Sequence, residues 1–362
     1  MKKGMKFIAT WAMLVGGLVF VACSSDDTSG PIPPQKEFKI PTASVFTNFR
    51  KEVLEGEKQY IQTKIDETGG FSFTSQKGVK VQVGNLAALG EWGIEGDEID
   101  CTFIELYEKG IMALANRPTM GIYPDRDENG YFEITKDEYG RIATTGGRGF
   151  IITGGEFYFD IKLNGKQVTN YSIDMQVPGK NTRGLQEDML LWQGNINEKD
   201  DLTFTEIPIQ TEMGFLYNDQ ETENYVMLLN GWNDLPSEIG WSNIDKYAEF
   251  EGEKTQFFVR VPEGYNYENS AIYFGVKGEE GLAHLDVFLK HLELGFVFTE
   301  HYGWVPVGLE GYVFFISIDP DTKKIVYSVK EIKVVKNQLV EIKFHDLQTG
   351  TKEEVISILN GL

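Results

Sequence analysis

The sequence predicts a mainly β protein of two antiparallel β-sandwich-like domains with few short helices, one of them at the C-terminus. Three observations support this fold class. Aromatic residues, which favour strands, make up 13% of the chain. The chain contains 39 glycines, and glycine favours tight turns. No alternation of strand, helix and strand repeats along the chain, which argues against a doubly wound parallel sheet.

The length of 362 residues predicts about two domains. Composition and turn signals divide the chain further, with a polar stretch at 195–201 before the loop-rich region. We expect a signal peptide over 1–22, a lipidated cysteine and flexible tether over 23–56, a first β-sandwich over 57–205, a loop-rich connection over 206–254 and a second β-rich domain with a C-terminal helix over 255–362.

Alternation of apolar and polar residues predicts the strands. In 79–83 the valines share one face, and in 156–163 apolar residues alternate with polar ones before Asn164 and Gly165. This Asn-Gly pair favours the positive backbone φ angles of a tight hairpin turn. Further strands are expected at 256–261, 271–276, 312–318, 325–335 and 339–344.

Two segments predict helices. Leu285, Phe288, Leu289 and Leu292 form one apolar stripe at helical spacing, which predicts a helix over 282–294. At the C-terminus, Thr351 is followed three residues later by Glu354. This spacing is typical of a capping box and predicts a terminal helix.

The N-terminus has the pattern of an export signal. Three lysines precede an apolar run over 7–22, which is short for a membrane span. The segment 19–23 resembles a bacterial lipobox, which implies that Cys23 carries acyl chains such as palmitate and becomes the first mature residue.

The residues after the cysteine, Ser24, Ser25, Asp26 and Asp27, resemble the surface-export signal of lipoproteins in Bacteroides-like bacteria. The alternative interpretation is a polar tether. The resemblance implies a lipid-anchored protein of the outer membrane that faces outward, with the periplasmic face as the alternative.

The charge balance excludes some partners. The chain has 55 acidic and 34 basic residues, and loss of the three signal-peptide lysines changes its net charge from −21 to −24. Such a charge disfavours nucleic acid and anionic lipid as partners. We therefore expect membrane attachment through the N-terminal lipid and not through a basic patch.

The first domain carries a family resemblance. The segments 73–83, 105–110 and 151–157 occur in the order seen in exported proteins of Bacteroides-like bacteria, which are similar to ZU5-type β-sandwiches. Segments 230–232 and 240–245 resemble a Gly-Trp-x-Asn-x-Asp pattern of the same group. The resemblance implies a ZU5-like β-sandwich for the first domain.

Catalytic motifs are missing from the sequence. Some ZU5-like domains cleave themselves at a histidine-containing site, but the first histidine of this chain is His284. No nucleophile elbow, phosphate-binding loop or dinucleotide fingerprint occurs. We expect a protein that is not an enzyme. A carbohydrate-active enzyme stays open as an alternative, because the separation of acidic pairs cannot be read from sequence.

Cys101 is expected in the core. It alternates with Ile99 and Phe103 on the apolar face of a strand. With Cys23 lipidated, no second cysteine is left for an intramolecular disulfide.

One segment resembles the start of a calcium loop. Asp125, Asp127 and Asn129 offer oxygens at alternate positions before Gly130, but the twelfth position is Lys136 where a bidentate Glu is usual. A calcium site here would be weak. We favour a hairpin turn at Asn129 and Gly130, and we expect no other cofactor.

Three tryptophans are candidate ligand-binding residues. Trp304, Trp232 and Trp241 lie in segments with Gly, Asn or Pro, where an exposed ring can stack on a sugar. Packing in a core or loop is the alternative. We favour packing for Trp232 and Trp241 and exposure for Trp304.

Together these observations predict a lipid-anchored outer-membrane or cell-surface protein with a binding or structural role. The alternatives are a carbohydrate-active enzyme or glycan-capture protein and a pilin or adhesin subunit. The expected partners are the membrane, through the lipid, and either a glycan or other surface proteins.

Overall fold

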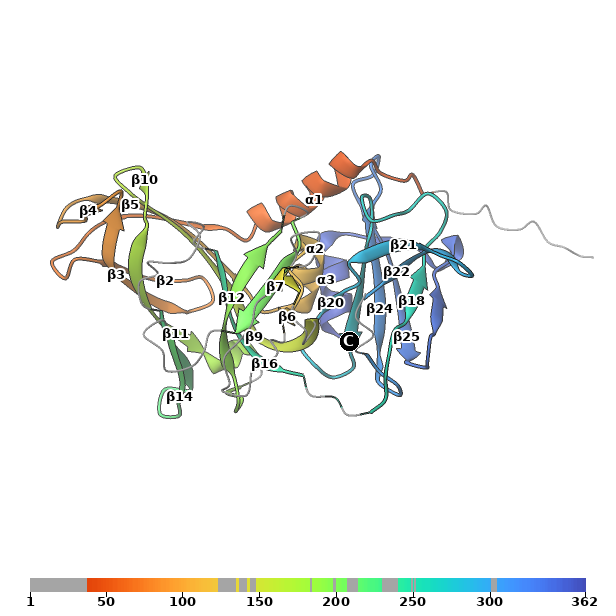
Figure 1. Ribbon diagram of the computed structural model, residues 1–362. Helices are drawn as coiled ribbons and strands as arrows, with labels where there is room; N and C mark the ends of the chain where they lie inside the picture. Colours follow the sequence, from red (N-terminus) through yellow and green to blue (C-terminus); the bar gives the residue numbers. More distant parts are fainter. Residues whose placement is uncertain are drawn as a thin grey trace, which may run out of the picture. The chain divides into compact units, whose positions relative to one another are not determined.

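Antiparallel β-sheets dominate the structure, which confirms the mainly β fold class (Figure 1). The computed structural model describes residues 38–122, 135–136, 142–143, 148–182, 184–197, 200–206, 214–229, 240–248, 250, 252–300 and 305–362. Cys23, Ser24, Ser25, Asp26, Asp27, Asp125, Asp127, Asn129, Trp232 and Trp304 lie outside the described residues.

The largest sheet has the order β1, β5, β9, β16, β12, β13 and β6, with β10 beside β9. Because β6 pairs with both β13 and β9, the strands from β9 to β6 close into a ring. The strands are β1 (Gln59–Lys64), β5 (Glu98–Leu106), β6 (Met120–Ile122), β9 (Arg148–Leu163), β10 (Lys166–Gln167), β12 (Leu190–Ile196), β13 (Leu202–Glu206) and β16 (Trp241–Tyr247).

A second sheet packs on one half of the first. Its order is β14, β15, β11, β3 and β2, with β4 beside β3. A core of side chains from β3, β11, β5 and β9 fills the space between the two sheets and includes Cys101. The strands are β2 (Phe71–Thr74), β3 (Lys80–Ala88), β4 (Glu91–Trp92), β11 (Asn170–Pro178), β14 (Gly214–Asp219) and β15 (Asn224–Leu229).

The C-terminal part contains a second sandwich with its own core. One sheet has the order β20, β19, β24, β25, β27, and the other has the order β21, β22, β18, β26. The strands are β18 (Phe258–Arg260), β19 (Ala271–Val276), β20 (Ala283–His284), β21 (Val287–His291), β22 (Gly295–Thr299), β24 (Glu310–Ile318), β25 (Ile325–Lys333), β26 (Leu339–Glu341) and β27 (Gln348–Gly350).

Two short pairs of strands and five helical segments complete the part of the fold that the structure describes. β17 (Lys254–Thr255) pairs with β23 (Val305–Pro306), and β7 (Thr135–Lys136) pairs with β8 (Ile142–Ala143). The helical segments are α1 (Ala43–Glu55), α2 (Lys109–Ala115), α3 (Lys352–Asn360) and the 3-10 turns η1 (Gly179–Thr182) and η2 (Phe344–Asp346). None of the described helices is long and apolar enough to cross a membrane.

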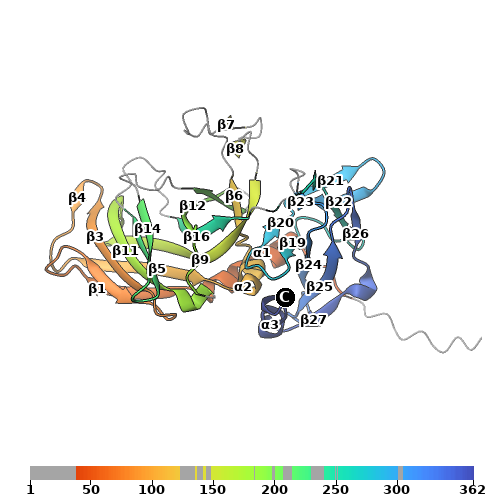
Figure 2. The same ribbon diagram turned by 90° about the horizontal axis from the view of Figure 1, so that it is seen from below.

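A third core joins the two sandwiches. It gathers side chains from all three α-helices, from the ring of strands and from β19 and β24, including Phe46, Met112, Trp192 and Phe314. Residues Phe38–Leu362 consequently form a single compact unit. Figure 2 shows α1, α2 and α3 together where the two sandwiches meet.

Several local expectations are confirmed. The turn after β9 has φ values of 50° at Asn164 and 76° at Gly165. Thr351 accepts a hydrogen bond from the Glu354 backbone at the start of α3, and Glu354 accepts one from the Thr351 backbone, which completes the capping box. Cys101 is 2% exposed, and burial raises its pKa to about 12.

The helix expected over 282–294 is wrong. The segment forms β20 and β21, and β21 turns at Gly295, whose φ is +75°, to pair with β22. Its apolar spacing fits a helix, but of the four residues in the expected apolar stripe only Leu285 is fully buried, and Leu292 is 102% exposed. Pairing with Gly295–Thr299 outweighs local periodicity here.

Two predicted ranges differ from the structure in detail. Part of the range 23–56, expected as a flexible tether, forms α1, whose Phe46, Phe49 and Val53 are buried. Thr42 caps this helix by accepting a hydrogen bond from the Val45 backbone. The range 206–254, expected as a loop-rich connection, contains β14, β15 and β16, which complete the two sheets of the first sandwich.

The contact between α2 and α3 yields a test of the junction. A Cβ atom on Gly110 would lie 2.8 Å from both the Cα and the carbonyl oxygen of Ile356. We expect Gly110→Ala to separate the two helices and to lower the free energy of unfolding by about 1–3 kcal/mol, measured by urea denaturation. Gly361→Ala is the matched control, because its Cβ would have no contact closer than 3.4 Å. Equal stability of both variants would show that α2 and α3 are not tightly packed.

Candidate functional site

The second sheet presents a row of polar side chains on the face turned away from its core. Strand β11 alternates throughout and β3 alternates over 80–83, so that Lys80, Gln82, Asp174 and Gln176 point outward while their neighbours enter the core. Side chains alternate across a strand, so this arrangement follows directly from the sequence pattern. Partial burial raises the pKa of Asp174 above its ordinary value.

Register places these polar groups side by side. Ser72 lies opposite Gln82, which lies opposite Asp174, and Thr74, Lys80 and Gln176 form the neighbouring row. Directly opposite residues in such a sheet have Cβ atoms about 5 Å apart. An open pocket of about 330 Å³ lies over these six residues, which we call the polar face.

An aromatic ring lies toward one end of the polar face. Trp92 in β4 is 63% exposed and pairs with Ala87 of β3. Leu86 and Ala88 belong to the core, so Ala87 and its partner Trp92 lie on the same side of the sheet as the polar face. The register with β11 pairs Gln82 with Asp174 and Ala87 with Asn170, which separates Gln82 from Ala87 by about 13 Å along the sheet. The face therefore offers an extended surface with an aromatic platform.

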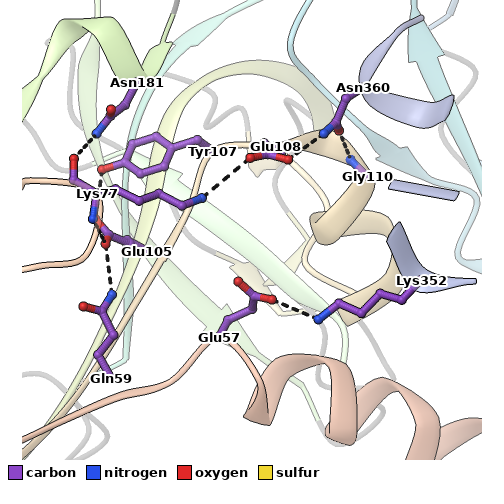
Figure 3. A network of polar contacts seen from close by, with 10 residues as sticks. All are labelled: Glu57, Gln59, Lys77, Glu105, Tyr107, Glu108, Gly110, Asn181, Lys352 and Asn360. Atoms are coloured by element: carbon purple, nitrogen blue, oxygen red, sulfur yellow. Dashed lines mark hydrogen bonds and ion pairs between the residues drawn. The ribbon is translucent and has the colours of Figure 1, made fainter. Parts of the chain in front are cut away.

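A buried carboxylate holds the turn that positions this face (Figure 3). Glu105 is 2% exposed and accepts hydrogen bonds from the Ser75 hydroxyl at 2.8 Å, the Lys77 backbone at 2.9 Å and the Gln59 amide at 2.9 Å. Ser75 in turn accepts the backbone N–H of Val79 at 2.9 Å. Glu105 thereby fixes the turn between β2 and β3, on either side of which Thr74 and Lys80 lie opposite each other.

The same network continues to the C-terminal helix. The Lys77 ammonium lies 3.8 Å from the Glu108 carboxylate and 5.2 Å from the centre of the Tyr107 ring. Glu108 accepts a hydrogen bond from the Asn360 amide at 2.6 Å, and Asn360 accepts one from the Gly110 backbone at 2.8 Å. Burial and the nearby Glu105 raise the pKa of Tyr107, so its ring stays neutral. Figure 3 shows these residues as one chain of contacts.

A second polar cluster is enclosed in the first sandwich beside the junction. Glu156 of β9 and Asp245 of β16 are 0% exposed, and Asn243 donates to Asp245 at 2.5 Å. Neither oxygen of Glu156 has a hydrogen-bond partner among the residues that the structure describes. Burial, and then the charge of Asp245, raise the pKa of Glu156 well above its ordinary value, while Arg117 acts in the opposite direction. Burial likewise raises the pKa of Asp245.

A third polar cluster joins the two sandwiches. Asp201 accepts a hydrogen bond from the Tyr267 hydroxyl at 2.6 Å and lies 3.5 Å from Nδ1 of His284. Burial favours a higher pKa for Asp201, but the contacts with His284 and Tyr267 outweigh it and hold the pKa well below its usual range. Both Asp201 and His284 are buried, so this cluster is an internal contact and not an accessible site.

Of the three tryptophans named from the sequence, the structure describes Trp241, which does not contribute to the polar face. Trp241 is 3% exposed and packs 5.4 Å from the Tyr158 ring and 5.3 Å from the Arg117 guanidinium. A fully enclosed ring has no face for a sugar. Within the described residues, no group of three or more His, Cys, Asp or Glu side chains is arranged to hold a metal ion.

The residues of the polar face were missed by the sequence analysis. The alternation at 79–83 was recognised, but only its apolar side was used. The register with β11, about ninety residues later, is not visible in a single sequence. Trp92 follows Gly90, a turn glycine with φ of 78°, and that Gly-x-Trp pattern was an available signal for an exposed ring.

The comparisons with known proteins add no functional assignment. No protein-family model matches the chain. No curated protein matches it either.

The two buried glutamates yield a paired test. Where folding raises the pKa of a carboxyl group, the free energy of unfolding of the protein falls as the pH rises from about 4 toward the folded-state pKa. We expect Glu156→Gln to remove that loss and to raise the free energy of unfolding at pH 7 to 8 by about 1 kcal/mol or more. Urea denaturation at several pH values measures it.

Glu105→Gln is the control with the opposite sign. Its carboxylate accepts several hydrogen bonds, so the amide should lower stability by about 1–3 kcal/mol. If both variants lost stability equally, Glu156 would have partners like those of Glu105.

Proposed function

We propose that this protein is a lipid-anchored binding protein of the bacterial outer membrane, displayed on the cell surface, which captures carbohydrate on the polar face. The observation that carries the proposal is the open pocket over Ser72, Thr74, Lys80, Gln82, Asp174 and Gln176, with Trp92 on the same side of the sheet.

The chemistry of the polar face fits sugar hydroxyl groups. A hydroxyl both donates and accepts hydrogen bonds, and the amides of Gln82 and Gln176 do the same. Asp174 accepts, Lys80 donates, and Ser72 and Thr74 do both. An aromatic ring such as Trp92 packs against the apolar face of a sugar ring.

The shape of the site favours binding over catalysis. The polar face lies on an open sheet surface, where water is not excluded from a reacting bond. The enclosed pair Glu156 and Asp245 is 0% exposed, so a substrate has no access to it. A carbohydrate-active enzyme would need two accessible carboxyl groups flanking the sugar bond.

The lipid anchor rests on the lipobox resemblance at Cys23. The described unit begins with Phe38, which is 8% exposed in the core of the second sandwich. The segment after Cys23 is polar at residues 24–30 and rich in proline at 31–41. Its composition is suited to a tether between lipid and folded unit.

The binding proposal is tested first on the polar face. A glycan array of the intact chain should identify a carbohydrate ligand, and calorimetry then measures its affinity. We expect Trp92→Ala to lower the affinity by about 1 kcal/mol, five- to tenfold, through lost stacking. Gln82→Ala and Asp174→Ala should each have a similar effect through lost hydrogen bonds.

Tyr60→Ala is the matched control for the aromatic substitution. Tyr60 is 65% exposed, as Trp92 is, but it lies on β1 in the other sheet. Its removal should leave the affinity unchanged. The proposal fails if no glycan binds, or if binding survives both Trp92→Ala and Gln82→Ala.

The anchor is tested separately. We expect Cys23→Ala to abolish labelling by an alkyne analogue of palmitate and to release the protein from the membrane fraction. Cys101→Ala is the matched control and should keep the label, because Cys101 is buried in the core. Label retained by Cys23→Ala would refute lipidation at this residue while leaving the binding test intact.

A further inference from the structure

Strand β21 forms one edge of its sheet. Among the described strands it pairs only with β22, so its other edge is not covered by them. Val287, Phe288 and Leu289 occupy its centre, and all three are half-buried. Edge strands are usually protected by charges, proline or bulges. The three central residues carry no charge and no proline, and their apolar side chains favour pairing with a further strand.

Apolar surface continues into the hairpin beside this edge. Leu292 at the turn is 102% exposed, and Phe296 of β22 is 58% exposed. The rings of Phe288 and Phe296 stack with centroids 5.6 Å apart. A partner strand next to β21 would cover part of this surface as well.

The charges at the ends of the strand are self-complementary. Asp286 precedes the apolar centre and Lys290 follows it, in the sequence Asp-Val-Phe-Leu-Lys. In an antiparallel pair of two such segments centred on Phe288, Asp286 of each copy lies opposite Lys290 of the other. Opposite charges directly across a sheet stabilise the pairing, and like charges destabilise it.

We propose that β21 pairs antiparallel with β21 of a second copy of this chain, centred on Phe288. The pairing would align Val287 with Leu289 on one face of the extended sheet and Phe288 with Phe288 on the other. It extends the four-stranded sheet of the second sandwich across two copies. The interaction is independent of the polar face, which belongs to the first sandwich.

The size of the contact sets its strength. Five residues pair on each side, so the dimer is expected to be of the weak, transient class. The net charge of −21 on each full chain opposes association, and this repulsion is screened at about 0.15 M salt. Anchoring both copies in one membrane would raise their local concentration.

Charge reversal tests the pairing. Sedimentation of the full chain with Cys23→Ala, at about 0.15 M salt and increasing concentration, measures the monomer–dimer equilibrium. Asp286→Lys and Lys290→Asp each place like charges opposite one another, and each should weaken association about tenfold. Glu67→Lys, an exposed position in the first sandwich, makes the same charge change as Asp286→Lys and should not weaken association.

Mixing the two variants provides the decisive result. The lysine introduced in one chain then faces the aspartate introduced in the other, so the mixture should associate as the unchanged chain does. The double variant Asp286→Lys with Lys290→Asp should recover association by itself, and melting temperatures verify that each variant is folded. A chain that stays monomeric throughout, variants that associate unchanged, or a mixture that does not recover would each overturn the proposal.

Discussion

Strand β9 is the constraint on which the rest of the fold depends. It pairs with β5 in the first sandwich, and with β16 and β6 in the ring of strands. Gly154 and Gly155 allow this change of partner: Gly155 has φ of +129°, and a Cβ on Gly154 would lie 2.8 Å from the carbonyl of Ile244. Beyond the glycines, Phe157 and Phe159 enter the core of the first sandwich, while Ile151 before them enters the junction. One strand thus carries side chains of two cores, in keeping with the single compact unit formed by Phe38–Leu362.

Glu105 and Glu156 are both buried, but their surroundings differ. Glu105 accepts hydrogen bonds from Gln59 and from the turn that contains Ser75 and Lys77, and these bonds hold the turn before β3. Glu156 lacks such donors and lies beside a second carboxylate. The first arrangement holds the turn that joins Thr74 and Lys80 of the polar face. The burial of Glu156 beside Asp245 is electrostatically unfavourable. Glu156 directly follows Gly154 and Gly155, where β9 changes its partner strands.

Local patterns predicted much of the fold because they depend on neighbouring residues alone. Alternation at Val79–Val83 and Phe157–Leu163, the Asn164-Gly165 turn and the cap at Thr351 all belong to this class. The segment around Phe288 was predicted as a helix because its apolar residues have helical spacing. In the structure it is a strand that pairs with β22 across a turn. The polar face could not be predicted, since it forms only when β3 and β11, about ninety residues apart, align Gln82 with Asp174. Trp241 was expected to pack and is buried, whereas the exposed Trp92 was overlooked.

The place of Phe38 at the start of the compact unit has a mechanical consequence. Phe38 is packed in the second sandwich, and α1 then places Phe46, Phe49 and Val53 against the junction core before the chain reaches β1 at the far side of it. Tension applied to the N-terminal segment therefore acts first on Phe38 in the second sandwich, then on α1 and the junction, and reaches β1 of the first sandwich last. The order of these elements along the chain thus sets the order in which they would be loaded.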